Sequence, residues 1–131
     1  MASDHAARLV AILKRAVDLQ PEADRIVRAC SAPGDVPRSM LSDAQRVTSV
    51  YARLGEELEP LRSDPAVSGL AVPAQQCVDH HLLLVDGAAN MALPPPPYHR
   101  RTDPRAAAEG LGEPGRRLRE LLQDARRLAG E

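Results

Sequence analysis

The feature that most constrains this chain is a 4-3 spacing of apolar and small residues that recurs in successive segments. The stripe of the first segment comprises Leu9, Leu13, Ala16, Gln20, Ala23, Val27 and Cys30. That of the second comprises Met40, Ala44, Val47, Tyr51, Leu54, Leu58 and Leu61. A period near 3.6 residues gathers such a stripe on one face of an α-helix, where it packs against a core. Each segment therefore predicts one helix of a bundle.

The second half of the chain shows the same period. The third stripe comprises Ala74, Cys77, His81, Leu84, Ala88 and Met91. Pro73 suits the first position of this helix, and the proline run 94–97 stops it. A last helix is expected over about 116–129, with inward-facing residues Leu118, Leu121, Leu122, Ala125 and Leu128.

Prolines and glycines mark the joints of the predicted bundle. Pro21 lies inside the first segment, where it either kinks the helix or splits it. Residues 94–103 form a Pro-rich connector, and Pro94–Pro97 serves as a spacer or as a polyproline II ligand. A short helix is expected through Ala108, before Gly110, Gly112, Pro114 and Gly115 break it. We therefore predict a single all-α domain over residues 1–131, an up-down bundle of about four helices with the last one broken.

Composition and charge exclude several function classes. The chain has no Phe or Trp and only two Tyr, so aromatic platforms for stacking bases are scarce, and its net charge is −1. We therefore expect no nucleic-acid partner. No stretch approaches the roughly 20 apolar residues of a membrane span, so no membrane partner is expected. Residues 1–10 lack the features of a signal peptide, which predicts a cytoplasmic protein.

The residues that could bind a metal or a cofactor are few and poorly spaced. Adjacent histidines on a helix point about 100° apart, so His80 and His81 cannot hold one metal together. Cys77 is the only potential metal ligand that lies three or four residues from His81, so a metal site on this helix would have one Cys and one His. The alternative is a buried, hydrogen-bonded His81 beside two buried free thiols, Cys30 and Cys77. We favour this alternative and expect no metal, no cofactor and no catalytic residue.

The stretch His80–Ala92 resembles the histidine-bearing helix of histidine phosphotransfer domains. Those domains carry a His-x-Leu-Lys-Gly pattern, whereas here His80 is followed by His81 and three leucines, so the lysine and the glycine are missing. The resemblance implies a four-helix bundle with a phosphoryl-accepting histidine.

Leu82 and Leu83 are the apolar residues that do not fit the third stripe. They fall on the back of the helix, where a bundle helix is normally polar. Either this helix lies centrally among the others, or another chain covers its back. We therefore predict a non-enzymatic helical scaffold or adaptor that binds another protein, or itself as a homodimer, through Leu82 and Leu83. The alternative is a phosphotransfer-like or metal-binding helical domain that uses His80 or His81.

Overall fold

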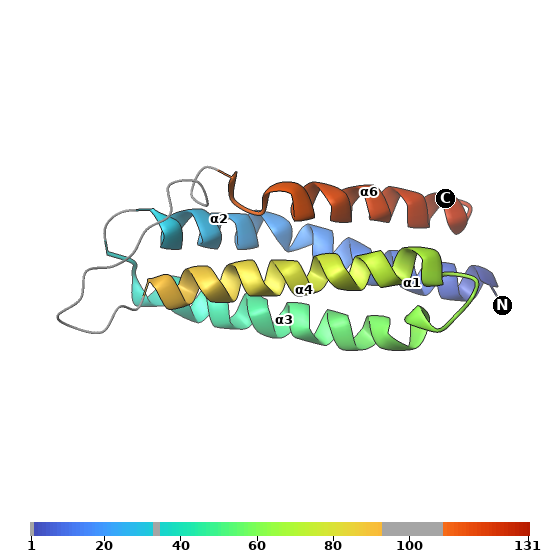
Figure 1. Cartoon of the computed structure of the whole chain (residues 1–131), viewed down its shortest axis with the longest axis horizontal. Coiled ribbons are helices and arrows are strands. Elements are labelled where there is room, and N and C mark those ends of the chain that lie inside the picture. Colours follow the sequence, from blue (N-terminus) through green and yellow to red (C-terminus); the bar gives the residue numbers. More distant parts are fainter. Residues whose placement is uncertain (1, 33–34, 93–108) are drawn as a thin grey trace.

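The computed structural model describes residues 2–32, 35–92 and 109–131, and it is all-α over these ranges. The elements are α1 (Ala2–Asp18), α2 (Gln20–Ser31), α3 (Arg38–Arg62), α4 (Ser68–Met91) and α6 (Gly112–Leu128). Because α1 and α2 form one long arm, the described helices make an up-down bundle in which each arm runs antiparallel to the next (Figure 1). The start of α1 and the end of α6 therefore lie at the same end. The predicted all-α bundle is confirmed.

Pro21 interrupts the first arm for one residue only. Leu19 lies between α1 and α2 and keeps right-handed helical dihedral angles. Its N–H donates to the Arg15 carbonyl at 3.2 Å, and the Ala23 N–H donates to the Leu19 carbonyl at 3.0 Å. Proline lacks an N–H, but in the first turn of α2 the helical hydrogen bonds resume directly after it. The arm is thus kinked, with a one-residue break.

The first two predicted stripes face a common core. Every residue of the first stripe is buried, and so is every residue of the second except the half-buried Met40. Tyr51 is the largest fully buried side chain, and its hydroxyl donates to the Ala16 carbonyl at 3.2 Å. This bond satisfies a buried polar atom and joins α3 to the last turn of α1, directly before the kink.

α4 contacts every other described helix, which explains why its sequence is apolar on most sides. It begins at Ser68, so the predicted start at Pro73 is wrong. The reason is a turn at Asp64, whose carboxylate accepts the Ala66 N–H at 2.9 Å and whose carbonyl accepts the Ser68 N–H at 2.7 Å. The helix therefore starts early enough to bury Ala71, and Pro73 lies inside it.

α6 also begins before its expected position, at Gly112 rather than near residue 116. Pro114 and Gly115, expected to break the helix, instead lie in its first turns. A proline there sacrifices no helical hydrogen bond, because the first N–H groups have no partner within the helix. Four of the five residues expected to face inward are buried, but Leu128 is 51% exposed. The expectation for Leu128 is wrong because this residue ends the helix at the edge of the bundle.

Cys30 and Cys77 are buried free thiols on α2 and α4, two helices that pack together, as predicted. Two other expectations, the connector 94–103 with its run Pro94–Pro97 and the short helix ending at Ala108, lie outside the described residues. No helix in the described part of the chain is long and apolar enough to cross a membrane.

Candidate functional site

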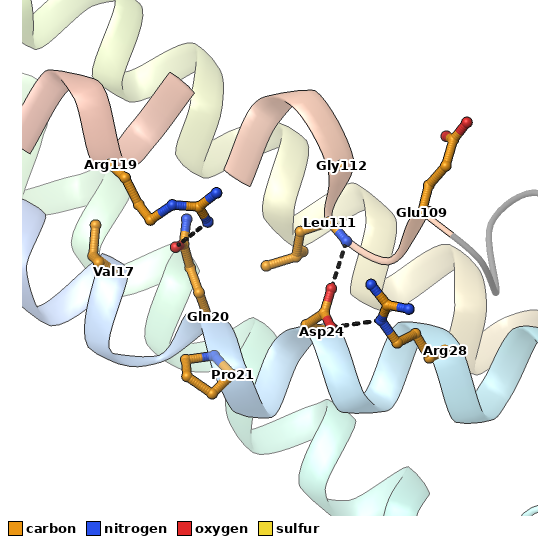
Figure 2. Close-up of a pocket in the computed structure, with 9 residues that line it drawn as sticks. All are labelled: Val17, Gln20, Pro21, Asp24, Arg28, Glu109, Leu111, Gly112 and Arg119. Carbon is orange, nitrogen blue, oxygen red and sulfur yellow. Dashed lines mark hydrogen bonds and ion pairs between the residues drawn. The ribbon is translucent and has the colours of Figure 1, made fainter. Parts of the chain in front are cut away.

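A cleft of about 520 Å³ lies between the kink of the first arm and the start of α6 (Figure 2). Its lining residues are Val17, Gln20, Pro21, Asp24, Arg28, Glu109, Leu111, Gly112 and Arg119. No hydroxyl, thiol, amine or imidazole side chain is among them. The cleft therefore presents amide, carboxylate and guanidinium groups.

Four polar side chains of this cleft are held by hydrogen bonds within the protein: Gln20, Asp24, Arg28 and Arg119. One Asp24 carboxylate oxygen accepts the Leu111 N–H at 2.9 Å, and the other accepts Arg28 Nε at 2.6 Å (Figure 2). Arg119 Nη1 donates to Gln20 Oε1 at 3.1 Å across the cleft. The carboxylate of Asp24 thus caps the N-terminus of α6 from a different helix.

A buried hydrogen-bonded chain continues from Gln20 into the core. The Gln20 amide Nε2 donates to the Gly115 carbonyl at 2.9 Å and contacts His81 Nε2 at 3.0 Å. His81 Nδ1 lies 2.6 Å from the Cys77 carbonyl. Because that carbonyl can only accept, Nδ1 carries the proton, and Nε2 accepts from the Gln20 amide. We call Gln20, Cys77, His81, Gly115 and Arg119 the polar junction, since they join α2, α4 and α6.

Burial keeps the central imidazole of this junction neutral. His81 is 0% exposed and packs edge-on against Tyr51, with ring centroids 5.3 Å apart. Desolvation lowers the pKa of His81 to about 4, despite its hydrogen bond to the Cys77 carbonyl. The nearby charges of His80 and Arg119 make smaller contributions to this lowering. With both ring nitrogens engaged and no access to solvent, His81 acts here as a structural residue, which confirms the predicted buried, hydrogen-bonded histidine.

The glycines at the start of α6 allow this close approach. Gly110 has a φ of 58°, and a Cβ there would lie 1.9 Å from an Asp24 carboxylate oxygen. At Gly115 a Cβ would lie 3.1 Å from the Leu111 Cβ and 3.7 Å from Gln20 Nε2. Gly110 therefore serves a steric and a conformational need at once.

His80 lies on the other side of α4, beside a second and shallower hollow. This hollow of about 370 Å³ is open to solvent and lies between α4 and α6; its lining residues are Gln76, Cys77, His80, Glu113, Pro114 and Arg117. Burial raises the pKa of the Cys77 thiol, and the positive charge of Arg117 partly offsets that rise. The sequence-predicted histidines are thus separated, with one in the core and one at the surface.

The two leucines predicted to bind a partner are also separated. Leu82 is half-buried and packs against the core, whereas Leu83 is 65% exposed. Leu83 belongs to an exposed 4-3-4 series on α4, which we call the outer stripe: Gln76, His80, Leu83 and Gly87. Of the exposed large apolar side chains in the described ranges, Val72 (38%) and Leu128 (51%) are less exposed than Leu83.

The residues that the structure describes contain no group of three or more His, Cys, Asp or Glu side chains that could hold a metal ion. Cys77 and His80 line the same hollow, but they are only two candidate ligands.

Sequence reasoning missed Gln20 as a key residue. A polar side chain at a core position of the first stripe was the available signal, because a buried amide needs partners on other helices. Comparisons with family models, with curated proteins and with solved structures find no significant match for this chain.

Proposed function

We propose that this chain is a non-enzymatic helical module that binds another protein, or a second copy of itself, through the outer stripe of α4. The observation that carries the proposal is the 65% exposure of Leu83 in the middle of a 24-residue helix. An exposed leucine on a rigid helix is a suitable anchor for a partner, since its burial gains about 25 cal/mol per Å² of apolar area.

The arrangement of the polar groups supports a binding role over a catalytic one. In the cleft beside Pro21, the Asp24 carboxylate and the guanidinium groups of Arg28 and Arg119 are used in contacts within the protein. His81 has both ring nitrogens engaged. The two free cysteines support a reducing compartment such as the cytoplasm.

Site-specific photo-crosslinking tests the proposal. A photoreactive amino acid in place of Leu83 should give a discrete covalent adduct with a partner, both in the purified protein at high concentration and in cells that express it. The matched control carries the same amino acid in place of Leu128, which is 51% exposed but lies on α6. Equal labelling from both positions, or none from position 83 in either setting, contradicts the proposal.

A second candidate function, phosphotransfer through His80, has one observation in its favour. The His80 imidazole is exposed, and Arg117 lines the same hollow, where a cation could neutralise a phosphoryl group. Phosphoramidate should then phosphorylate the wild-type protein and His81→Gln but not His80→Gln, as followed by phosphorus NMR. Unphosphorylated wild-type protein rules out this candidate.

A further inference from the structure

The hydrogen bonds of the polar junction fit together in a single arrangement of donors and acceptors. Gln20 Oε1 accepts from Arg119 Nη1 at 3.1 Å. At the other end of the same amide, Nε2 donates to the Gly115 carbonyl at 2.9 Å and lies 3.0 Å from His81 Nε2. His81 Nδ1 carries the proton that the Cys77 carbonyl accepts. The imidazole must therefore be neutral, so that its Nε2 can accept the second N–H of the Gln20 amide.

A proton on His81 Nε2 breaks this match in either orientation of the Gln20 amide. In the present orientation, two N–H groups face each other across 3.0 Å. If the amide turns end for end, its oxygen accepts from the imidazolium but then also faces the Gly115 carbonyl. The amide N–H groups then face the Arg119 guanidinium. Both contacts with α6 become mismatched, and mismatched polar groups of this kind destabilise a buried contact.

The charged and titratable groups around His81 do not neutralise such a proton. Tyr51 of α3 packs edge-on against the ring, and burial raises its pKa, so it stays a neutral phenol. Burial likewise raises the pKa of the Cys77 thiol on α4. Arg119 of α6 and His80 of α4 both disfavour the imidazolium. The described neighbours that face His81 thus include basic groups and no carboxylate, so a proton there adds repulsion across the contact with α6.

We propose that the polar junction is an acid-sensitive switch that holds α6 on the bundle while His81 is neutral and releases α6 when His81 is protonated. α6 is the helix that responds, because two of the three partners of the Gln20 amide belong to it. The packing of α3 against α4 does not involve α6 and remains. This switch goes beyond the proposed function and does not depend on the outer stripe. Release exposes the residues of α6 that are otherwise buried in the core: Leu118, Leu121, Leu122 and Ala125.

Thiol labelling distinguishes release of α6 from unfolding of the whole bundle. Two matched probes replace buried alanines, Ala125→Cys on α6 and Ala44→Cys on α3, in a chain that also carries Cys30→Ala and Cys77→Ala. A pyridyl disulfide reagent labels the probe in acid as well as at neutral pH, and each rate is divided by that of the urea-unfolded chain at the same pH.

The expected result is a rise in labelling that is confined to α6. Between pH 7.5 and 4.5 the relative rate for Ala125→Cys should increase roughly 50- to 100-fold, because the pKa of His81 is about 4 in the docked state and 6.5 after release. The rate for Ala44→Cys should change far less. An equal rise at both positions shows that the whole bundle unfolds, and no rise at position 125 shows that α6 stays docked. Either result overturns the proposal.

Two further variants of the Ala125→Cys chain test the parts of the switch. His81→Leu should abolish the rise, because no group at that position titrates, and a rise that persists there overturns the proposal. Arg119→Met should speed labelling at pH 7.5, since a docking bond is lost, and should also reduce the rise with acid, since the turned amide no longer meets a guanidinium. Arg126→Met removes another arginine of α6 and should change neither. An Arg119→Met profile that keeps the full rise overturns the role of the guanidinium.

Discussion

The two sides of α4 use the same residue types for opposite purposes. Towards the core, His81 is enclosed by Tyr51, Gln20 and the carbonyl of Cys77, and it has no exposed surface. Towards the solvent, His80 lines an open hollow. A rotation of about 100° between neighbouring helical positions is sufficient to produce this contrast. Neighbouring residues in a sequence therefore need not share an environment or a role.

The contrast also predicts where the free energy of unfolding is sensitive to substitution. On the inner side, both ring nitrogens of His81 and the Gln20 amide have buried partners, and removal of one partner leaves another group unsatisfied. On the outer side, water fills the space that a shortened side chain leaves. Changes to the polar junction should therefore alter stability, whereas changes to the outer stripe should alter association.

The largest expected effect is that of His81→Ala compared with His80→Ala. His81→Ala leaves a buried cavity and an unpaired Gln20 N–H, so it should lower the free energy of unfolding by about 3 kcal/mol. His80→Ala should change it by less than about 0.5 kcal/mol. Urea unfolding followed by circular dichroism measures both values. Similar losses in the two variants would contradict the assignment of separate environments.

Acidification should weaken the inner side next. His81 has a folded pKa lowered from 6.5 to about 4, so between these values the unfolded chain binds one more proton than the folded one. Stability contributed by the neutral imidazole is therefore complete above pH 6.5 and declines as the pH falls towards 4. Between pH 7.5 and 4.5 the loss amounts to roughly 2–3 kcal/mol. This part of the pH dependence should be absent in His81→Leu, and an unchanged slope in that variant would contradict it.

Gly110→Ala should have a somewhat smaller effect, about 2 kcal/mol of destabilisation. A Cβ at this position meets Asp24 and forces a positive φ on a non-glycine residue, so the cap on the Leu111 N–H is lost. Gly112 also has a positive φ, 56°, but there the nearest neighbour of a Cβ lies at 3.8 Å. Gly112→Ala is thus the matched control and should cost about 1 kcal/mol. Thermal unfolding that ranks the two variants in the opposite order would exclude a steric role for Gly110.

The smallest effect distinguishes the two leucines of α4. Leu82→Ala removes a half-buried side chain that packs on the core and should cost about 1 kcal/mol. Leu83→Ala should leave the free energy of unfolding within about 0.5 kcal/mol of wild type. Chemical denaturation at low protein concentration, where association is negligible, gives both numbers. A larger loss from Leu83→Ala would mean that this side chain supports the fold.

Sequence pattern was sufficient for the fold wherever apolar period and burial coincide. The stripes from Leu9 to Cys30 and from Ala44 to Leu61 are buried as their spacing indicates. Helix starts were less predictable, because Pro73 and Pro114 were each interpreted as boundaries. In the fold, a turn at Asp64 and a cap from Asp24 start these helices several residues earlier.

The candidate site was less accessible from sequence, because its partners come from distant segments. The position of His81 on a stripe predicted its burial, but nothing local indicates that Gln20 is the residue that satisfies it. Likewise, the helical wheel placed Leu82 and Leu83 together on the back of the helix. Only the positions of the neighbouring helices determine that one contacts the core and the other does not.

The bonds of Gln20 have a consequence for how the chain assembles. Its partners on α6, Gly115 and Arg119, are 95 and 99 residues further along the sequence. Individual helices form within about a microsecond, but a ribosome that adds 5–20 residues per second needs roughly 5–20 s to reach these partners. During synthesis the first arm is therefore made several seconds before Gln20 can reach either partner on α6. Docking of α6 is then the step that excludes water from the polar junction and completes the described bundle.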